Sequence, residues 1–511
     1  MDNRDTQATW HYHNGTKHPN GYLMNPRHMF DPTRRPKLFK TYIALQPLPL
    51  PLDTSTIGVS ALNAISVDVS PGAQDRIPDL WTLARILYFS AGITKRLTFP
   101  WGEMLFRAAA CTGALYHIEL YLVCDDVPDL KAGVYHFDPG DLALRQLRRG
   151  DYRRVLMDAT GNEPSVAQAP AIVVCTDVSS RNSCKYEARE YRHAFWDSGT
   201  ILGHTLAMSA AHEIPAKIIA GFVDATVNRL LDLDTKREAA LALVPIGYAP
   251  NATVESSPKV EPLHLETEPI SDHEIEFPAI REMHEASSLE DVQEVIAWRG
   301  ATSRMTTTEP SGHLFPLHPH TKDEMSRASI ERVIIRRGST RRFSHEPITF
   351  RQLSTILERA TRGVAADFLK PLGVTLNDLY MIVNAVDGLE SGSYVFDGKR
   401  RTLELLQAGD LRHMAGHLAL NQQLGADASV DIFFLADLNP ILERLGNRGY
   451  RIAQLDASIT ASRLYLAAYA QRLGATGLTF FDDAVTEFFS PHAHGKSVMF
   501  LIALGKKGRR R

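Results

Sequence analysis

The sequence predicts an α+β protein built from two similar units that pair with each other inside one chain. Two observations predict this class. Segments of the first half recur in the second half at one constant spacing. In both halves, apolar strands alternate with amphipathic helices without a regular strand–helix–strand order. Two related units in one chain are most simply arranged as an internal dimer with a pseudo-twofold axis.

The repeat keeps one register over roughly a hundred residues. Residues 133–156 match residues 392–415, which lie 259 positions later (392 − 133), and residues 189–197 match 448–456 at the same spacing. The same spacing pairs Phe222, Asp224 and Ala225 with Phe481, Asp483 and Ala484. A shared origin of the two units explains this constant register better than a coincidence of strand and turn patterns.

Each unit has the same expected order of elements. An amphipathic helix with apolar residues at helical spacing comes first, and an apolar strand, a hairpin, a short helix and a buried strand follow. A long helix that begins near Tyr191 or Tyr450 and a last apolar strand complete the unit. The opening helices are expected at 80–92 and 350–363, the first strands at 118–124 and 376–383, the buried strands at 171–177 and 430–437, and the last strands at 241–247 and 498–505.

The predicted units cover residues 55–250 and 326–511. Residues 1–54 form an N-terminal segment, and residues 251–325 are rich in Pro, Ser, Thr, Glu and His, which is typical of a linker. One helix is expected in that linker at 287–300, where a serine N-cap precedes an acidic first turn. The histidines that follow it have no metal-ligand spacing, so no metal site is expected.

Composition excludes several classes of protein. The chain has 511 residues, 44% of them apolar and 23% charged, which leaves room for two or more domains. A net charge of −3 gives no general attraction to nucleic acid or to a membrane surface. The start lacks a signal-peptide pattern, and no apolar run is long enough to span a membrane. Its four cysteines are scattered, so we expect a cytoplasmic protein without disulfides.

The units differ in their basic segments. Residues 336–343 read RRGSTRRF before the opening helix of the second unit, and Lys506 and Lys507 follow its last strand. The corresponding residues 66–75 of the first unit contain no arginine. Guanidinium groups and a hydroxyl just before a helix suit a phosphate, whereas Arg342 is expected to face solvent. The alternative is an ordinary solvated basic surface.

The first unit keeps two other features. Its small-residue turn from Cys111 to Ala114 precedes an apolar strand, and such a turn lets a flat ligand approach the backbone. Lys185 and Tyr186 stand before its long helix, where the second unit has Arg444 and Leu445. Each unit has therefore lost what the other retains, although the Lys–Tyr pair alone is also compatible with a solvated helix start.

These motifs resemble the nitroreductase superfamily, and within it the SagB-type (ThcOx-like) flavin-dependent dehydrogenases. The segments RRGSTRRF, CTGALYHIELYLV and KYEAREYRHAFWDSG carry the resemblance, together with the N-terminal HYHNGTKH. It implies tandem nitroreductase-like domains and one FMN site composed from both units. The implied cofactor residues are Arg336, Arg337, Ser339, Arg341, Lys506, Lys507, Gln422, Cys111, Thr112, Gly113, Ala114, Leu115, Thr479 and Phe480, and the implied catalytic residues are Lys185 and Tyr186.

The resemblance implies a dehydrogenase or oxidase that uses O2. Tyr186 would remove a proton while the substrate loses a hydride, and Lys185 would favour the phenolate by lowering the pKa of Tyr186. The substrate would be an azoline-type heterocycle or another small or peptidyl intermediate of natural-product biosynthesis. Two alternatives stay open: an NAD(P)H-dependent nitro or quinone reductase, and a degenerate flavin-binding partner protein. A second flavin site would lack its phosphate-binding residues. The backbone segment that faces the flavin in the family falls on Thr479 and Phe480, with Ala220 and Gly221 at its place in the first unit, and Phe480 is expected to narrow the substrate space. Nucleic acid and membrane are not expected partners, and a further homo-oligomer stays open.

Overall fold

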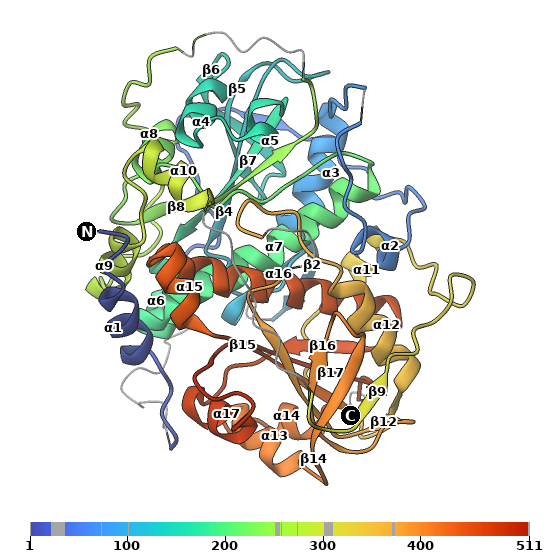
Figure 1. The fold of residues 1–511 in the computed structure, drawn as a ribbon. Coiled ribbons are helices and arrows are strands. Elements are labelled where there is room, and N and C mark those ends of the chain that lie inside the picture. Colours follow the sequence, from blue (N-terminus) through green and yellow to red (C-terminus); the bar gives the residue numbers. More distant parts are fainter. Residues whose placement is uncertain are drawn as a thin grey trace.

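The computed structural model describes residues 2–21, 36–72, 74–100, 102–250, 256, 258–272, 274–300, 310–369 and 374–508. The two halves form two sheets with a pair of long helices between them (Figure 1). The first sheet has the order β1-β6-β5-β4-β7-β8, and the second has the order β16-β17-β15-β11-β13-β14-β9. Strand pairs in both are antiparallel, which confirms the α+β class.

The bounds of the elements follow the expected order in each half. The first sheet contains β1 (Pro47–Pro49), β4 (Ile118–Cys124), β5 (Gly133–Asp138), β6 (Ala143–Arg149), β7 (Ala171–Val178) and β8 (Glu238–Ile246). The second contains β9 (Leu314–Pro316), β11 (Asp378–Val383), β13 (Gly392–Asp397), β14 (Thr402–Ala408), β15 (Val430–Ala436), β16 (Gly474–Gly477) and β17 (Ser497–Gly505). Two small strand pairs lie outside these sheets: β2 (Ile93–Phe99) with β3 (Gly102–Arg107), and β10 (Ile348–Thr349) with β12 (Val386–Asp387).

Helices surround the two sheets. In the first half they are α1 (Gln7–Gly15), α2 (Ala61–Ala64), α3 (Leu80–Ala91), α4 (Arg153–Ala159), α5 (Pro164–Ala167), α6 (Ser180–Tyr186), α7 (Glu190–Ala211) and α8 (Asp224–Leu230). In the second half they are α9 (Pro278–Ala286), α10 (Val292–Gly300), α11 (Ile330–Arg336), α12 (Phe350–Ala360), α13 (Arg412–Leu418), α14 (Gln423–Asp427), α15 (Leu438–Leu445), α16 (Arg448–Ala470) and α17 (Asp482–Phe489). None of the described helices is both long and apolar enough to cross a bilayer.

The helices α7 and α16 lie side by side at the centre and join the two halves (Figure 1). Small residues allow this close approach. A Cβ added at Gly199 would lie 1.6 Å from the hydroxyl of Ser458, which donates a hydrogen bond to the carbonyl of Phe195 at 2.8 Å. Ser462 donates to the carbonyl of Thr200 in the same way, at 3.0 Å. The predicted pairing of the two units within one chain is therefore built around this helix pair.

The structural repeat also includes segments whose sequences show no repeat. Strand β1 is antiparallel to β6, and β9 is antiparallel to β14 in the same place of the second sheet. Helices α1 and α9 also correspond, because Arg192 donates to the carbonyl of His13 at 2.7 Å and Arg451 donates to the carbonyl of His284 at 2.6 Å. The helix expected at 287–300 is present as α10, but it begins only at Val292, and Asp291 takes the place of the expected serine N-cap by accepting from the Glu294 amide at 2.9 Å. The region that we interpreted as a linker thus contains counterparts of N-terminal elements.

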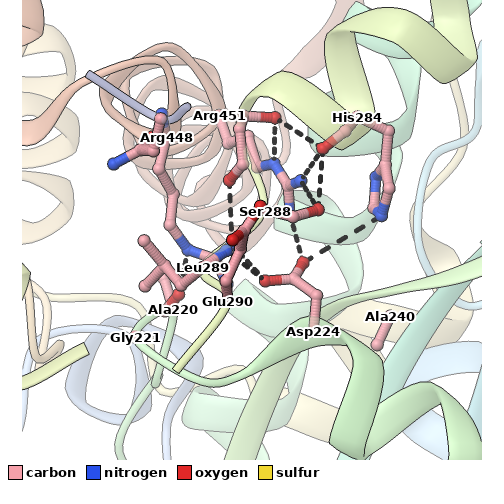
Figure 2. A network of polar contacts seen from close by, with 12 residues as sticks. Ala220, Gly221, Asp224, Ala240, His284, Ser288, Leu289, Glu290, Arg448 and Arg451 are labelled. Carbon is pink, nitrogen blue, oxygen red and sulfur yellow. Dashed lines mark hydrogen bonds and ion pairs between the residues drawn. The ribbon is translucent and has the colours of Figure 1, made fainter. Parts of the chain in front are cut away.

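Two equivalent networks of buried charge connect the halves. Asp224, at the start of α8, accepts from Arg448 at 2.7 Å and from Arg451 at 2.9 Å (Figure 2). At the start of α17, Asp482 instead accepts from the equivalent arginines Arg189 and Arg192, at 3.0 and 2.6 Å.

Asp224 therefore corresponds to Asp482, which is 258 positions later (482 − 224), and the pairing with Asp483 in the sequence analysis was wrong by one residue. The aromatic neighbours agree, since Arg448 lies 4.6 Å from the ring centre of Phe222 and Arg189 lies 5.2 Å from that of Phe480.

Candidate functional site

The basic segment 336–343 runs along the edge of the second sheet. Its Thr340 amide donates to the carbonyl of Ala475 at 2.9 Å, and Phe343 forms an antiparallel bridge with Lys507. This pairing brings two distant stretches of sequence to the end of α16. There, Arg336 donates to the carbonyl of Tyr469, and the ammonium of Lys507 lies 3.9 Å from the centre of the Tyr469 ring. Two of the expected cations, Arg336 and Lys507, therefore lie at the same end of α16.

Arg337 reaches from the second half to the first. Its Nε donates to the carbonyl of Ala108 at 2.7 Å, and its Nη2 donates to the carbonyl of Arg107 at 3.1 Å. Those carbonyls lie just before Cys111, the start of the small-residue turn. The structure therefore places the basic segment of one unit against the turn of the other, as a composite site requires.

The remaining residues predicted to bind phosphate are less uniform. The Ser339 hydroxyl faces the phenol of Tyr465, and Arg341 is exposed but close enough to Tyr186 to lower its pKa. Lys506 faces Glu346 on the surface, with 3.5 Å between Nζ and Oε2. Arg342 is exposed, as expected. Lys506 is consequently the member of the set that the structure directs away from the others.

Asp197 of α7 holds the small-residue turn. Its carboxylate accepts from the Thr112 amide at 2.8 Å, from the Thr112 hydroxyl at 2.9 Å and from the Cys111 thiol at 3.1 Å. Gly113 has φ of 63° and Ala114 has φ of 53°, so the turn is tight, and Leu115 after it is buried. One feature of the sequence marks Asp197, its identity with Asp456 in the repeat. Asp456 likewise holds the second unit's counterpart segment, accepting from the amide of Leu376 at 2.8 Å.

A buried histidine lies behind Asp197. The two nitrogens of His117 lie 2.7 Å from Asp197 and 2.6 Å from Asp177, and Glu190 is 3.3 Å away. Burial alone would lower the pKa of His117, but its hydrogen bonds with the two aspartates raise the pKa well above the usual range. Burial and the nearby Asp177 raise the pKa of Glu190. The positive charge of His117 therefore compensates the negative charge of Asp197, the carboxylate that orients the turn. Sequence analysis did not select His117, whose counterpart in the repeat is the apolar Leu376.

Lys185 and Tyr186 end α6 beside this turn. A Cβ on Gly113 would lie only 2.9 Å from the Tyr186 hydroxyl, and the Lys185 ammonium lies 5.1 Å from the centre of the Tyr186 ring. Burial raises the pKa of Tyr186, Asp197 and Cys111 raise it further, and Arg341 partly opposes them. The expected lowering of this pKa by Lys185 is therefore wrong for this structure, because the buried phenolate would lose its hydration beside a carboxylate.

The segment 478–482 of the second half completes the site. The ring of Tyr186 packs edge-on against His193, with centroids 4.6 Å apart. Arg189, three residues after Tyr186, lies 5.2 Å from the centre of the Phe480 ring and pairs with Asp482 at 3.0 Å, and His18 Nδ1 lies 3.3 Å from the Thr479 hydroxyl. The chain segment that follows the catalytic candidates of the first unit thus contacts segment 478–482 of the second.

Two further expectations are corrected at this segment. Phe480 is fully buried and packs against Arg189 and Trp196, so it does not narrow an open space. The spacing of 258 also makes Leu478 and Thr479 the counterparts of Ala220 and Gly221, in place of Thr479 and Phe480.

The side chain of Gln422 folds back on its own turn. Its Nε2 donates to the carbonyl of Ala419 at 2.9 Å. The turn that carries it nevertheless lies beside segment 478–482, because the Phe481 amide donates to the carbonyl of Leu418 at 3.0 Å.

The pseudo-symmetric counterpart of this site is filled by side chains. Asp367 is buried, and its carboxylate accepts from the amides of Ala220 and Gly221 at 2.9 Å each. Beside it, Lys217 pairs with Glu163, the counterpart of Gln422, at 2.6 Å. The residues from Lys370 to Gly373, part of the bulky segment that replaces the small-residue turn, lie outside the described residues. Ala220 and Gly221 are the counterpart of the backbone segment that would face a flavin, and their amides thus already bind a carboxylate.

Comparison with known proteins agrees with this geometry. Residues 334–506 match the family model described as "Nitroreductase family". The second unit is therefore similar to this family over most of its length. MJ1384 of Methanocaldococcus jannaschii, a nitroreductase by name, is 26% identical over 194 residues, which cover 36% of this chain and 94% of that protein. The microcin B17-processing protein McbC of Escherichia coli is 26% identical over 135 residues, 25% of this chain and 49% of McbC. The chain thus spans about half the length of McbC.

A crystal structure described as a nitroreductase from Anabaena variabilis matches almost the whole chain. It superposes with a TM-score of 0.76 over 98% of this chain and 99% of that chain, at 24% identity. The arrangement of the two units in this chain is therefore also found in another protein of the nitroreductase fold. Members of the nitroreductase family are oxidoreductases and typically bind FMN.

Proposed function

We propose that this protein is an FMN-dependent oxidoreductase with one composite flavin site per chain. The observation that carries the proposal is Arg337, which belongs to the basic segment of one unit and is bonded to the residues that precede the ring-binding turn of the other. Arg336, Ser339, Arg341 and Lys507 would hold the phosphate with it. The side chains of Lys506 and Gln422 point elsewhere, so only the chain segments that carry them belong to the proposed site.

The residues present fit such a cofactor. Guanidinium and ammonium groups from two chain segments converge at the end of α16, which suits a phosphate dianion. The turn from Cys111 to Leu115 has only small side chains at its apex, and Gly113 leaves its surface bare next to Tyr186. Thr479 would contribute to the site from the second unit. FMN, when bound there, would accept a hydride and pass the electrons to an acceptor.

We propose a dehydrogenase or oxidase as the first reaction class. The likeness to McbC, which is named for processing microcin B17, supports a peptidyl substrate of natural-product biosynthesis. A small heterocyclic substrate and O2 as the acceptor are proposed from the resemblance of the sequence motifs alone. Tyr186 would take the substrate proton as a phenolate, which becomes neutral in that step, and Lys185 would stabilise the phenolate beforehand. The raised pKa of Tyr186 requires substrate binding to bring the pKa down.

The raised pKa also favours a second candidate. A protonated phenol is a proton donor, so the same site suits a reductase that takes electrons from NAD(P)H and delivers them to a nitro compound or a quinone. In this direction Tyr186 would donate its proton to the reduced product, and no change of its protonation state before the reaction is needed.

One experiment separates the candidates. The purified chain is loaded with FMN, made anaerobic and mixed with NADPH. Bleaching of the flavin absorbance supports the reductase, whereas bleaching only by a peptidyl or heterocyclic substrate supports the dehydrogenase. A Lys185→Ala, Tyr186→Phe variant should bleach slowly with the substrate of the dehydrogenase. If the protein is the reductase, the variant should bleach normally with NADPH and pass its electrons slowly to the nitro compound or quinone. A wild-type protein that takes up no FMN would refute both.

A further inference from the structure

The segments that follow α1 and α9 occupy equivalent places in the two halves. The His18 amide donates to Asp482 at 2.9 Å, and the Asp482 amide donates to the carbonyl of His18 at 3.3 Å. The Leu289 amide donates to Asp224 at 3.0 Å, and the Asp224 amide donates back to the carbonyl of Leu289 at 3.3 Å (Figure 2). His18 and Leu289 are therefore counterparts at the level of the backbone.

The residues next to His18 and Leu289 also differ between the two sites. His18 Nδ1 lies 3.3 Å from the hydroxyl of Thr479. Thr479 has Gly221 as its counterpart, at the spacing of 258 that the arginine networks establish (479 − 221). The site with the cation cluster thus has a histidine and a threonine in contact, whereas the filled counterpart has a buried leucine and a glycine without a side chain.

The filled counterpart holds its backbone segment in another way. Asp367 accepts from the amides of Ala220 and Gly221, so its carboxylate covers the amide groups of that segment. Ala108, 259 positions before Asp367, has no side chain that could do the same, and its carbonyl accepts from Arg337. A carboxylate at that place would occupy the space in which the cofactor edge is expected. The segment at Thr479 therefore needs a support that leaves its inner face uncovered.

We propose that His18 and Thr479 form a positioning pair that supports segment 478–480 from outside the flavin pocket and leaves its inner face to the cofactor. The inference rests on the proposed function and assigns a role in the flavin site to the N-terminal segment. Arg189 and Arg192 secure that segment, because they donate to the carbonyl and hydroxyl oxygens of Thr16.

The imidazole in this pair is neutral over the working pH range. Burial lowers the pKa of His18 to about 3, with Arg189 and Arg192 lowering it and Asp482 raising it. The support is therefore a neutral hydrogen bond that does not change between pH 5 and pH 9, and it contributes by geometry and not by charge.

The test replaces His18 and Thr479 by the residues at the equivalent places in the other half, which are leucine and glycine. The single variants His18→Leu and Thr479→Gly and the double variant are titrated with FMN, and the midpoint potential of the bound flavin is measured. Each single change should weaken FMN binding roughly two- to tenfold, which corresponds to the loss of one neutral hydrogen bond, and shift the potential. The double variant should lose no more than either single variant, because both remove the same contact.

Controls distinguish positioning from general stability. Lys17→Ala removes a surface ion pair with Asp483 on the same segment and should leave FMN affinity and potential unchanged. His18→Gln keeps a hydrogen-bonding side chain and should recover most of the affinity. Unchanged affinity and potential in His18→Leu, or additive losses in the double variant, would overturn the positioning role alone. No FMN uptake by the wild-type chain would overturn the proposed function, and with it this inference.

Discussion

Replacing Asp224 by Asn should destabilise the protein without changing its flavin site. The Asp224 carboxylate is buried and accepts from Arg448 and Arg451, so the change leaves two buried guanidinium groups without their counter-charge (Figure 2). Breaking a buried ion pair in this way costs about 3–5 kcal/mol. For domains of this size that corresponds to a fall in Tm of roughly 6–20 °C.

The difference in Tm between wild type and Asp224→Asn should depend on pH in a defined direction. Burial alone would raise the pKa of Asp224, but Arg448 and Arg451 outweigh it and hold the pKa below the usual value. A depressed carboxylate pKa contributes stability that is present above the unfolded pKa of about 3.9 and is lost as the pH falls through the folded pKa. The difference in Tm between wild type and Asp224→Asn should therefore be constant from pH 8 to pH 5 and shrink only below about pH 4.

The assay is thermal unfolding followed by circular dichroism, with Asp483→Asn as the matched control. Asp483 is an exposed aspartate whose ion pair with Lys17 lies on the surface, so its loss should change Tm by less than about 2 °C. A fall in Tm as small as this in Asp224→Asn, or a difference that disappears at pH 6, would refute the reasoning. FMN affinity should stay at the wild-type value, since Asp224 and its arginines lie beside Ala220 of the filled counterpart and not beside the proposed flavin site.

Three further predictions concern the site. Arg337→Ala should weaken FMN binding roughly ten- to hundredfold by fluorescence titration, since hydrogen bonds from charged groups contribute about 1.5–3 kcal/mol, whereas Arg342→Ala should not change it. Tyr186 should stay protonated at pH 10 because its pKa is raised, so the ultraviolet titration difference between wild type and Tyr186→Phe should appear only above that pH; a phenolate signal below pH 9 would contradict this. Asp367→Ala should lower Tm by leaving two buried amides unsatisfied, yet keep the same number of flavins per chain, because Lys217 and Glu163 still fill the pocket; a gain of a second flavin would show otherwise.

The sequence allowed prediction of those parts of the fold in which side chains repeat at fixed spacing. The strand pairs β5–β6 and β13–β14 and the helices α7 and α16 lie where the repeat of 259 placed them. The correspondence of α1 with α9, and of β1 with β9, left almost no trace in the sequence, because those elements are held chiefly through backbone atoms. Arg192 and Arg451, for example, bind carbonyl oxygens, which any residue supplies.

The site was predictable to a similar degree and for similar reasons. The cations of the second unit and the turn of the first were visible because their chemistry is unusual for ordinary surface segments. The pairing of Asp224 with Asp483 was wrong because two consecutive aspartates, Asp482 and Asp483, offer an identity in either register, and only the arginine contacts decide between them. Asp367 was not recognisable, since a single aspartate in a loop has no signal until the fold brings it to the amides of Ala220 and Gly221.

The number of FMN molecules per chain tests the central claim most directly. The purified protein is saturated with FMN, freed of excess cofactor, and its flavin and protein contents are measured separately. One flavin per chain is predicted, because Arg337 connects the basic segment to the turn in one half while Asp367 fills the counterpart in the other. Two flavins per chain would contradict the assignment of Asp367, and none would contradict the composite site.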